Sequence, residues 1–497
     1  MTHLLGIDIG TSSVKALVFD ADERKSVGVG AQEYPIYMPH VGYAEQDPDD
    51  YWQATIKAVR QALAQAGNVR IVGISFSGQM HGTVLLDAHH KPVHRAIIWA
   101  DGRATNESET LLTKVPYWAQ IAGTDPAVGF QIVTLAWLAQ HNVPLLKQTH
   151  CVILPKDYVR FRMTGEVSTD ISDAASTGAL NIRTGKWSDE LLAAAGVDMP
   201  IMPTIHLSAQ VVGTLRLEAA IELGLPAGIP VVAGCADQPA QAIGSGLVTP
   251  GIGSVTIGTG GQVFVPYRPE STLQTDTRLH VFNHAVPNTW YVLGAILAAG
   301  SALGWLRNLT GLQNRADAYE TLSYEASQVK VGADGLLFLP YLFGERTPHM
   351  DALASGAFFG LRYHHGRGHL ARAVMEGVSF ALREVLTISL TLGAQVDELV
   401  IAGGGAQSKV WRQILTDVLG VPLKRSQHSE QASLGAAILA GVGVGVYPDV
   451  ATACASISAY DTPNQPNTDA KTRYDDLFVT YQNLYPTLKE TMHSLAR

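Results

Sequence analysis

The stretch Leu4-Leu5-Gly6-Ile7-Asp8-Ile9-Gly10-Thr11-Ser12-Ser13-Val14-Lys15-Ala16-Leu17-Val18-Phe19-Asp20 decides the fold. Two apolar runs rich in β-forming residues flank a Gly-Thr-Ser-Ser segment, which predicts two strands joined by a polar turn. Asp8 stands just before the turn, and aspartate is unfavourable in a strand interior. The turn offers backbone N–H groups and hydroxyls suited to a polyphosphate. An ordinary hairpin in which Asp8 stabilises the turn explains the stretch equally well.

A second stretch, residues 253–265, repeats this plan: an apolar run, a turn at Gly258-Thr259-Gly260, and another apolar run. We interpret this as a weak internal repeat, with one hairpin opening each half of the chain. A length of 497 residues favours two domains. The turn-rich Val248-Thr249-Pro250-Gly251 divides the chain into an N-terminal domain, 1–248, and a C-terminal domain, 249–497, ending in a helix. A ligand site is then expected in the cleft between them.

Composition narrows the class of partner. The net charge of −9 gives no basic surface for nucleic acid, so we expect no nucleic-acid partner. No apolar run is long enough for a bilayer, and no leader pattern opens the chain, so no membrane partner is expected either. Three widely spaced cysteines, Cys151, Cys235 and Cys454, fit a reducing cytoplasm better than a disulfide framework.

The remaining pattern alternates strands and helices, which is typical of an α/β protein with mixed sheets. A helix is predicted over 51–66 after Asp47-Pro48-Asp49-Asp50, and a strand over 69–76 that ends at Ser77-Gly78-Gln79-Met80-His81-Gly82. Further strands are predicted over 96–99, 231–236 and 398–402. Further helices are predicted over 295–309, over 369–392 and from about residue 472.

The glycine run Gly403-Gly404-Gly405 does not complete a dinucleotide-binding fingerprint, because Ser408 occupies the place of the last glycine. The lysine-containing P-loop signature is absent as well. An ATP site would therefore depend on the two Gly-Thr hairpins and this glycine-rich turn, whose backbone N–H groups could bind phosphates. Asp8 could hold Mg²⁺, through water, because that ion keeps part of its hydration shell.

Asp237 follows a buried strand and is the candidate to take a proton from a substrate hydroxyl. It also precedes a predicted helix, so a helix-capping role is the alternative. Gln79, Met80 and His81 suit a small polyhydroxylated ligand, although a lone histidine is more often structural. Asp101 and Arg103 are expected to form an ion pair near the same rim.

These motifs identify a family. The chain resembles the FGGY carbohydrate kinases of the actin-like ATPase superfamily, and most closely their xylulokinase branch. The matching segments are 6–12, 78–82, Leu154-Pro155-Lys156-Asp157-Tyr158, 163–166, 339–341, Gly344-Glu345-Arg346-Thr347-Pro348-His349 and 403–406. The resemblance implies two actin-like (ribonuclease H-like) α/β domains, each with a mixed sheet, and ATP in the interdomain cleft. The reaction it implies is the phosphorylation of D-xylulose to D-xylulose 5-phosphate.

The resemblance also implies residue roles. Asp237 would be the catalytic base, and Asp8 would support Mg-ATP as the metal residue. The predicted substrate-binding set is Gln79, Met80, His81, Asp101, Arg103, Asp237 and Gln238, of which Met80, His81 and Gln238 match sugar-site positions. The predicted nucleotide-binding set is Thr11, Ser12, Ser13, Lys15, Thr259, Gly260, Gly300, Gly404, Gly405 and Ser408.

Two positions depart from the family pattern. Many xylulokinases have Asp-Asn where this chain has Asp237-Gln238, and Thr134 replaces a signature lysine. A kinase of another sugar or polyol (ribulose, L-xylulose, gluconate or glycerol) is therefore the alternative function. A non-catalytic sensor of ATP and sugar is a further one. A homodimer is also an expectation.

Overall fold

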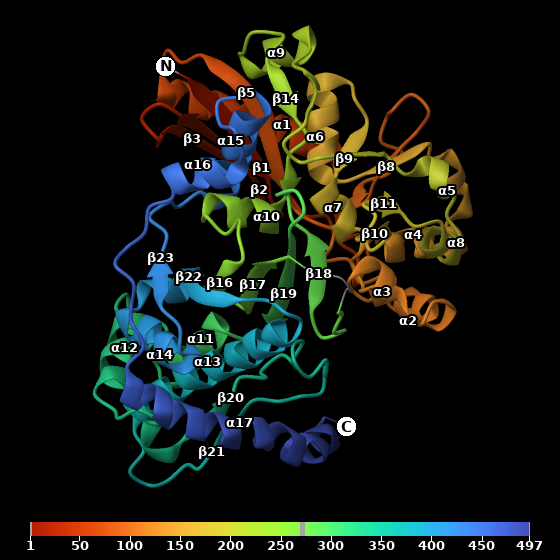
Figure 1. The fold of residues 1–497 in the computed structure, drawn as a ribbon. Coiled ribbons are helices and arrows are strands. Elements are labelled where there is room, and N and C mark those ends of the chain that lie inside the picture. The colour runs from red at the N-terminus through yellow and green to blue at the C-terminus, as the bar shows by residue number, and fades with distance from the viewer. Residues whose placement is uncertain (1, 269–273, 497) are drawn as a thin grey trace.

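The computed structural model describes residues 2–268 and 274–496. The chain forms two α/β halves, each built on a mixed sheet flanked by helices (Figure 1). The α/β class with one mixed sheet per half is therefore confirmed. Within the described residues, no helix is both long and apolar enough to cross a bilayer.

The first sheet has the strand order β13-β14-β5-β1-β2-β3, and β15 pairs with β5 beside that path. The strand β1 is antiparallel to β2 and parallel to β5, so β1 and β5 end at the same edge. The bounds are β1 (His3–Ile9), β2 (Ser13–Asp20), β3 (Lys25–Glu33), β5 (Ile71–Gly78), β13 (Val211–Thr214), β14 (Pro230–Val232) and β15 (Cys235–Ala236).

The second sheet has the order β18-β19-β17-β16-β22-β23. Its strand β16 is antiparallel to β17 and parallel to β22, which repeats the arrangement of β1 with β2 and β5. The two predicted hairpins and the internal repeat are thus confirmed. The bounds are β16 (Gly251–Ile257), β17 (Gly261–Tyr267), β18 (His280–Asn283), β19 (Trp290–Ile296), β22 (Val396–Ala402) and β23 (Leu423–Arg425).

Helix α1 (Pro48–Ala66) shows how local sequence sets an element. Asp47 is its N-cap, with a side chain that accepts a hydrogen bond from Asp49 N, and Pro48 occupies the first turn, where its missing N–H costs nothing. Its apolar face packs on β3 and β2. The approach is close, because a Cβ at Gly30 would lie 2.0 Å from the carbonyl oxygen of Ala58.

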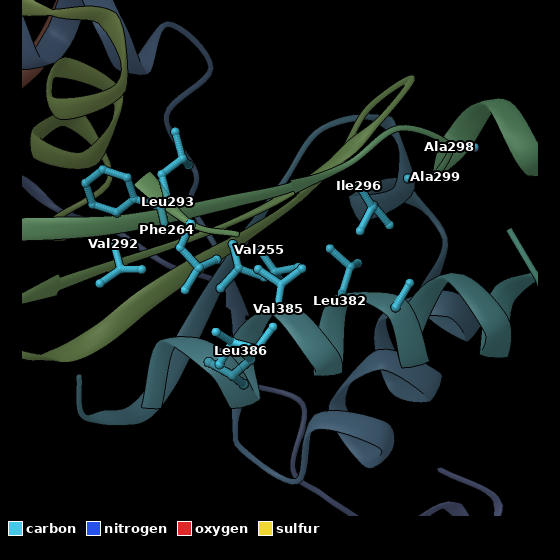
Figure 2. Packing of buried hydrophobic residues seen from close by; sticks show 14 of the residues in the cluster. Val255, Phe264, Val292, Leu293, Ile296, Ala298, Ala299, Leu382, Val385 and Leu386 are labelled. Atoms are coloured by element: carbon cyan, nitrogen blue, oxygen red, sulfur yellow. The ribbon is translucent and has the colours of Figure 1, made fainter. Parts of the chain in front are cut away.

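Helix α13 (Arg367–Thr391) packs under the second sheet. Figure 2 shows Leu382, Val385 and Leu386 of this helix beneath buried side chains of the sheet, such as Val255 of β16 and Val292 of β19. Burial of this apolar surface is the main stabilising contribution to this half.

The chain returns to the first half near its end. Helix α15 (Gln431–Gly443) packs on β1, on β5 and on α10 (Asp237–Gly244), as the blue helix beside the red sheet in Figure 1 shows. Small residues permit the contact: a Cβ at Gly6 would lie 1.9 Å from the carbonyl oxygen of Ser433, and one at Gly435 would lie 2.0 Å from that of Ala240. The boundary predicted at residue 248 stays a prediction.

The other elements complete the two halves. The small sheets pair β4 (Glu45–Gln46) with β7 (Ala96–Ile97), β6 (Val84–Leu86) with β8 (Cys151–Ile153), β9 (Ser168–Asp170) with β12 (Thr204–His206), β10 (Leu180–Asn181) with β11 (Lys186–Trp187), and β20 (Leu337–Leu339) with β21 (Ala357–Phe359). The helices are α2 (Thr105–Lys114), α3 (Trp118–Ala122), α4 (Gln131–His141), α5 (Val143–Gln148), α6 (Pro155–Thr164), α7 (Ile171–Ser176), α8 (Asp189–Ala195), α9 (Leu217–Leu223), α11 (Gly300–Leu309), α12 (Ala318–Ser327), α14 (Lys409–Leu419), α16 (Val450–Ile457) and α17 (Thr468–Leu495), with 3₁₀ turns η1 (Met199–Ile201), η2 (Ala333–Gly335) and η3 (Gly404–Gln407).

Three predicted elements differ from the structure. The strand predicted over 231–236 is interrupted at Ala233 and Gly234, which separate β14 from β15. The helix predicted from residue 295 begins at Gly300, because Ala295 and Ile296 still belong to β19 and pair with β17. The strand predicted over 96–99 covers only Ala96–Ile97.

Thr134, which replaces the signature lysine, is buried in α4.

Replacement of Gly435 by alanine should force α10 and α15 apart. We expect a loss of about 1–3 kcal/mol in the free energy of unfolding, as for other overpacked sites, measured by chemical denaturation. Gly366→Ala is the control, because a Cβ there would meet nothing within 4 Å. Equal stability of the two variants would contradict the close packing.

Candidate active site

Two aspartates meet at the carboxyl edge of the first sheet. Asp8 on β1 lies opposite Ser77 of β5 in the register, and the Ser77 hydroxyl donates a hydrogen bond of 2.7 Å to Asp8 Oδ1. On the other side of β5, Ala236 of β15 pairs with Gly78. Asp237 follows Ala236 directly, so β5 brings the two carboxylates to one place.

The protein environment raises the pKa of both carboxylates. Burial, and then the charge of Asp8, raises the pKa of Asp237 to about 7. Burial also raises the pKa of Asp8, while the hydrogen bond from Ser77 and the charge of Lys15 partly offset that effect. A carboxylate that titrates near neutral pH can accept a proton from a hydroxyl and release it again.

Asp237 does not occupy the N-cap position of the helix that follows it, although a hydrogen bond from the backbone N–H of Gln238 acts on its carboxylate and lowers its pKa. Asp237 is the first residue of α10, whose N-cap is Ala236, and this N-cap makes no side-chain hydrogen bond.

Asp8 could contribute to the binding of a hydrated divalent cation, but it would supply few of the ligands. Among the described residues, none donates a hydrogen bond to Asp8 Oδ2, so this oxygen is available to a ligand. The same part of the chain contains no group of three or more acidic, histidine or cysteine side chains that could hold a metal ion. A Mg²⁺ ion near Asp8 would therefore take most of its ligands from water and substrate phosphates, as this ion commonly does.

The loop after β5 places His81 in a defined orientation. Its Nδ1 lies 2.6 Å from the carbonyl oxygen of Ser176, so Nδ1 carries the proton and Nε2 is a hydrogen-bond acceptor. The ring stacks on Phe130 at a centroid distance of 4.1 Å. Burial lowers the pKa of His81 to about 4, which keeps the imidazole neutral. The φ of +70° at His81 is a strained conformation for a residue other than glycine.

The neighbouring residues are more enclosed. Gln79 and Met80 are buried, and the Gln79 amide donates a hydrogen bond of 2.8 Å to Gln46 Oε1. Gln46 in turn donates to the carbonyl oxygen of Thr11, so it links the loop after β5 to the first hairpin. Gln238 lines a cavity of about 20 Å³ between α10 and the second sheet.

Asp101 and Arg103 form the expected ion pair, with Arg103 Nε 2.8 Å from Asp101 Oδ1. Arg103 also contacts Glu45 at 2.6 Å and lies over the ring of Tyr43. The other Asp101 oxygen accepts a hydrogen bond from Ala44 N. These contacts fix the loop before β4 and occupy the polar atoms of the pair, and a substrate-binding role for it stays a prediction.

The turn of the first hairpin is held from several sides. The Tyr34 hydroxyl donates to the carbonyl oxygen of Gly10, and Trp99 Nε1 donates a 2.9 Å hydrogen bond to Thr11 Oγ1. Ser12 is exposed, whereas Ser13 is partly buried. Lys15 forms an ion pair of 2.9 Å with Glu430, which immediately precedes α15. The lysine predicted on the nucleotide side is thus paired within the protein.

The second hairpin borders a cavity of about 740 Å³, a volume suited to a small-molecule ligand. The backbone N–H groups of Gly300 and Ser301 donate to the carbonyl oxygens of Gly258 and Thr259, which fixes the start of α11 against the turn. Gly405 allows the approach on the other side, because a Cβ there would lie 2.4 Å from Ile257 Cγ2.

The structure brings five predicted nucleotide residues to this cavity: Thr259, Gly300, Gly404, Gly405 and Ser408. Gly260 does not line it, and neither do the predicted residues of the first hairpin. Side chains of α12 and α14 that carry no motif also line it: Tyr319, Glu320, Ser323, Lys409, Val410 and Trp411. Ser408 is also the N-cap of α14 and accepts a hydrogen bond from Trp411 N.

Asp237→Asn should stabilise the ligand-free protein at pH 8, because it removes a carboxylate that burial disfavours. The folded pKa of about 7 lies above the ordinary value of 3.8, so the wild type loses stability as the pH rises from about 4 to about 7. The loss is at most about 1.4 kcal/mol for each unit of pKa difference. The gain in the variant should grow over this range and then level off.

Thermal unfolding from pH 4 to pH 8 measures this difference. Asp476→Asn, at an exposed position on α17, is the control and should show no such growth. A pH-independent difference between Asp237→Asn and the wild type would show that the carboxylate is not destabilised by its surroundings.

Both halves match models of known protein families. Residues 3–244 match the model of the FGGY family of carbohydrate kinases, N-terminal domain, and residues 253–444 match the corresponding C-terminal domain. A xylulose kinase of Bacillus subtilis (strain 168) is 35% identical over 494 residues, which is 99% of this chain and 98% of that protein.

The chain is also similar to a solved xylulose kinase structure and to a gluconokinase. The crystal structure of xylulose kinase from Rhodospirillum rubrum superposes with a TM-score of 0.92 at 30% identity, over 99% of this chain and 100% of that one. A gluconokinase of Bacillus subtilis (strain 168) is 29% identical over 511 residues, which is 100% of this chain and 98% of that protein.

Proposed function

Because the chain belongs to the FGGY family of carbohydrate kinases, we propose that it transfers the γ-phosphoryl group of ATP to D-xylulose. Membership of the family makes the protein an ATP-dependent sugar kinase, which acts on a small-molecule sugar and ATP. The xylulose kinase relatives support the specific sugar. The product is D-xylulose 5-phosphate.

The observation that carries the proposal is the place of Asp237, at the end of a buried strand with a pKa raised to about 7. Asp237 accepts the proton of the sugar hydroxyl as the hydroxyl oxygen attacks the γ-phosphorus. The bond between the γ-phosphorus and the β–γ bridging oxygen breaks, and ADP leaves. Little other covalent help is needed from the protein.

The other predicted residues have supporting roles in this proposal. Mg²⁺ near Asp8 would neutralise charge on the phosphates. The turns at Gly10-Thr11 and Gly258-Thr259 are proposed to face the phosphates, and the cavity of about 740 Å³ is proposed to hold the adenosine. A cytoplasmic location and a homodimer stay predictions.

Gluconate is the second candidate substrate. The charge of Arg346 partly offsets the rise that burial causes in the pKa of its neighbour Glu345, and it helps to lower the pKa of His81 and of His280. A cation close to the proposed sugar site could neutralise a carboxylate. The gluconokinase relative supports this alternative.

A substrate panel with Asp237→Asn tests the proposal. The wild type should form ADP fastest with D-xylulose among D-xylulose, D-ribulose, L-ribulose, L-xylulose, gluconate and glycerol. With that sugar, Asp237→Asn should lower kcat by about 10² to 10⁴, as expected for a lost general base, and Asp476→Asn should leave kcat unchanged. The acid limb of kcat/KM for the wild type should lie near pH 7.

Two results would contradict it. Near-normal turnover by Asp237→Asn would remove Asp237 from the chemistry. Preference for gluconate over D-xylulose would reassign the substrate but leave the kinase activity in place.

His81→Ala should weaken sugar binding, because Nε2 is the free acceptor of a ring whose other nitrogen is already bonded to Ser176. We expect KM for the sugar to rise about tenfold, in line with the loss of the one hydrogen bond that Nε2 can accept. The KM for ATP, measured in the same assays, should stay within about twofold of the wild type. An equal rise in both constants would show a general loss of structure.

A further inference from the structure

A group of charged side chains lies completely buried beside the proposed catalytic aspartate. This ion cluster comprises Lys156, Asp157 and Arg160 from α6, Asp170 at the end of β9, and Asp173 from α7, each at most 1% exposed. Lys156 Nζ lies 2.6 Å from Asp157 Oδ1, 2.9 Å from Asp170 Oδ1 and 3.1 Å from Asp173 Oδ2. None of these five side chains belongs to the predicted substrate or nucleotide sets.

Stability alone does not explain such a cluster. Removal of charges from water costs several kcal/mol per ion, and apolar side chains of similar volume often stabilise a core equally well. Burial lowers the pKa of Lys156, but the three neighbouring carboxylates outweigh it and the pKa is raised, so the ammonium group stays charged. Burial raises the pKa of Asp173 well above its usual value, whereas Lys156 and Arg160 outweigh burial at Asp157 and hold its pKa below that value. The charged members therefore include Lys156, Arg160 and Asp157, and their positions are tightly constrained.

The cluster contacts the segment that ends at Asp237. Arg160 donates a hydrogen bond of 2.6 Å to the carbonyl oxygen of Ala233. Ser172 donates to Asp170 Oδ2 at 2.6 Å, and the same Ser172 oxygen accepts a hydrogen bond of 3.1 Å from Ala236 N. A continuous chain of contacts therefore runs from Lys156 through Asp170 and Ser172 to the residue before Asp237.

The cluster also fixes the other side of the site. The strand β5 lies between β1 and β15, and a Cβ at Gly78 would lie 2.7 Å from Lys156 Cβ. Lys156 thus packs directly against the residue of β5 that pairs with Ala236. Both supports of Ala236, the strand pair and the Ser172 hydroxyl, depend on this one region.

We propose that Asp170 and Ser172, held in place by Lys156, are positioning residues that fix the carboxylate of Asp237 relative to the substrate hydroxyl. The proposal rests on the proposed role of Asp237 as the general base. Ser172 fills the hydrogen-bonding capacity of Ala236 N–H, and Asp170 orients the Ser172 hydroxyl so that its lone pair faces that N–H. Small displacements of a catalytic group have large kinetic effects.

The chain offers a matched control. Ser208 also donates to Asp170 Oδ2, at 2.7 Å, and is buried like Ser172, but the hydrogen bond from Ala236 N goes to the Ser172 hydroxyl and not to that of Ser208. Ser172→Ala and Ser208→Ala therefore each remove one hydroxyl from the same carboxylate. Only Ser172→Ala leaves Ala236 N–H without its acceptor.

Steady-state kinetics of the two variants tests the proposal. Ser172→Ala should lower kcat about tenfold, with KM for sugar and ATP within about twofold of the wild type, whereas Ser208→Ala should keep kcat within about twofold. The acid limb of the Ser172→Ala profile should move to lower pH, because a looser Asp237 is better solvated and ionises more easily. Equal kcat values for the two variants, or an unmoved acid limb, would overturn the proposal.

Two further comparisons keep the test decisive. If Ser172→Ala does not fold, Ser172→Thr and Ser172→Val replace it, because the two side chains have the same size and only threonine has a hydroxyl. The kcat of Ser172→Thr should then be about tenfold higher than that of Ser172→Val. Equal kcat values would overturn the proposal. Asp237→Asn, assayed in parallel, separates the two hypotheses. If Asp237→Asn is inactive while Ser172→Ala matches Ser208→Ala, the positioning role fails and the general base stands.

Discussion

The pairing of β5 with β1 on one side and β15 on the other is the constraint on which the site depends. Asp8 and Asp237 are more than two hundred residues apart in the chain, and this one strand brings both to the same sheet edge. The parallel direction matters, because carboxyl ends of parallel strands meet where loops can present side chains to a ligand. The serine of β5 that pairs with Asp8 also holds its carboxylate by a hydrogen bond.

The same placement creates an energetic conflict. Burial disfavours the ionised form of Asp237, the charge of Asp8 adds to that effect, and the pKa of about 7 for Asp237 expresses the cost. A protein selected only for stability would avoid the arrangement. Rigid support from the surrounding strands and from α15 is what keeps such a pair in place despite the cost.

Local patterns account for much of what the sequence predicted. The two Gly-Thr hairpins, α1 with its Asp47 cap, and the strand before Asp237 each depend on short-range signals, and the structure contains all of them. The start of α11 was missed because the segment before it is an unbroken apolar run, which suits a buried strand as well as a helix.

Tertiary contacts explain what could not be predicted of the site. Tyr319 and Glu320 line the large cavity only because α12 packs beside α14, and neither belongs to a motif. Gln46 was likewise overlooked, although it joins the first hairpin to the loop after β5. Close packing explains the glycines at 300 and 405, where a Cβ would lie 2.4 Å from a neighbouring atom, but not the one at 404, where a Cβ would meet nothing within 4 Å.

The repeated hairpin has one more consequence. If the turns at Gly10 and Gly258 are superposed, the place of Asp8 on β1 corresponds to Thr256 on β16, which pairs with Ala402 of β22. The pseudo-symmetry of the backbone is therefore not a symmetry of charge, since one copy carries an acid and the other a neutral hydroxyl. A duplicated backbone thus does not duplicate its chemistry, because only the first hairpin has a carboxylate at this position and the second has a hydroxyl.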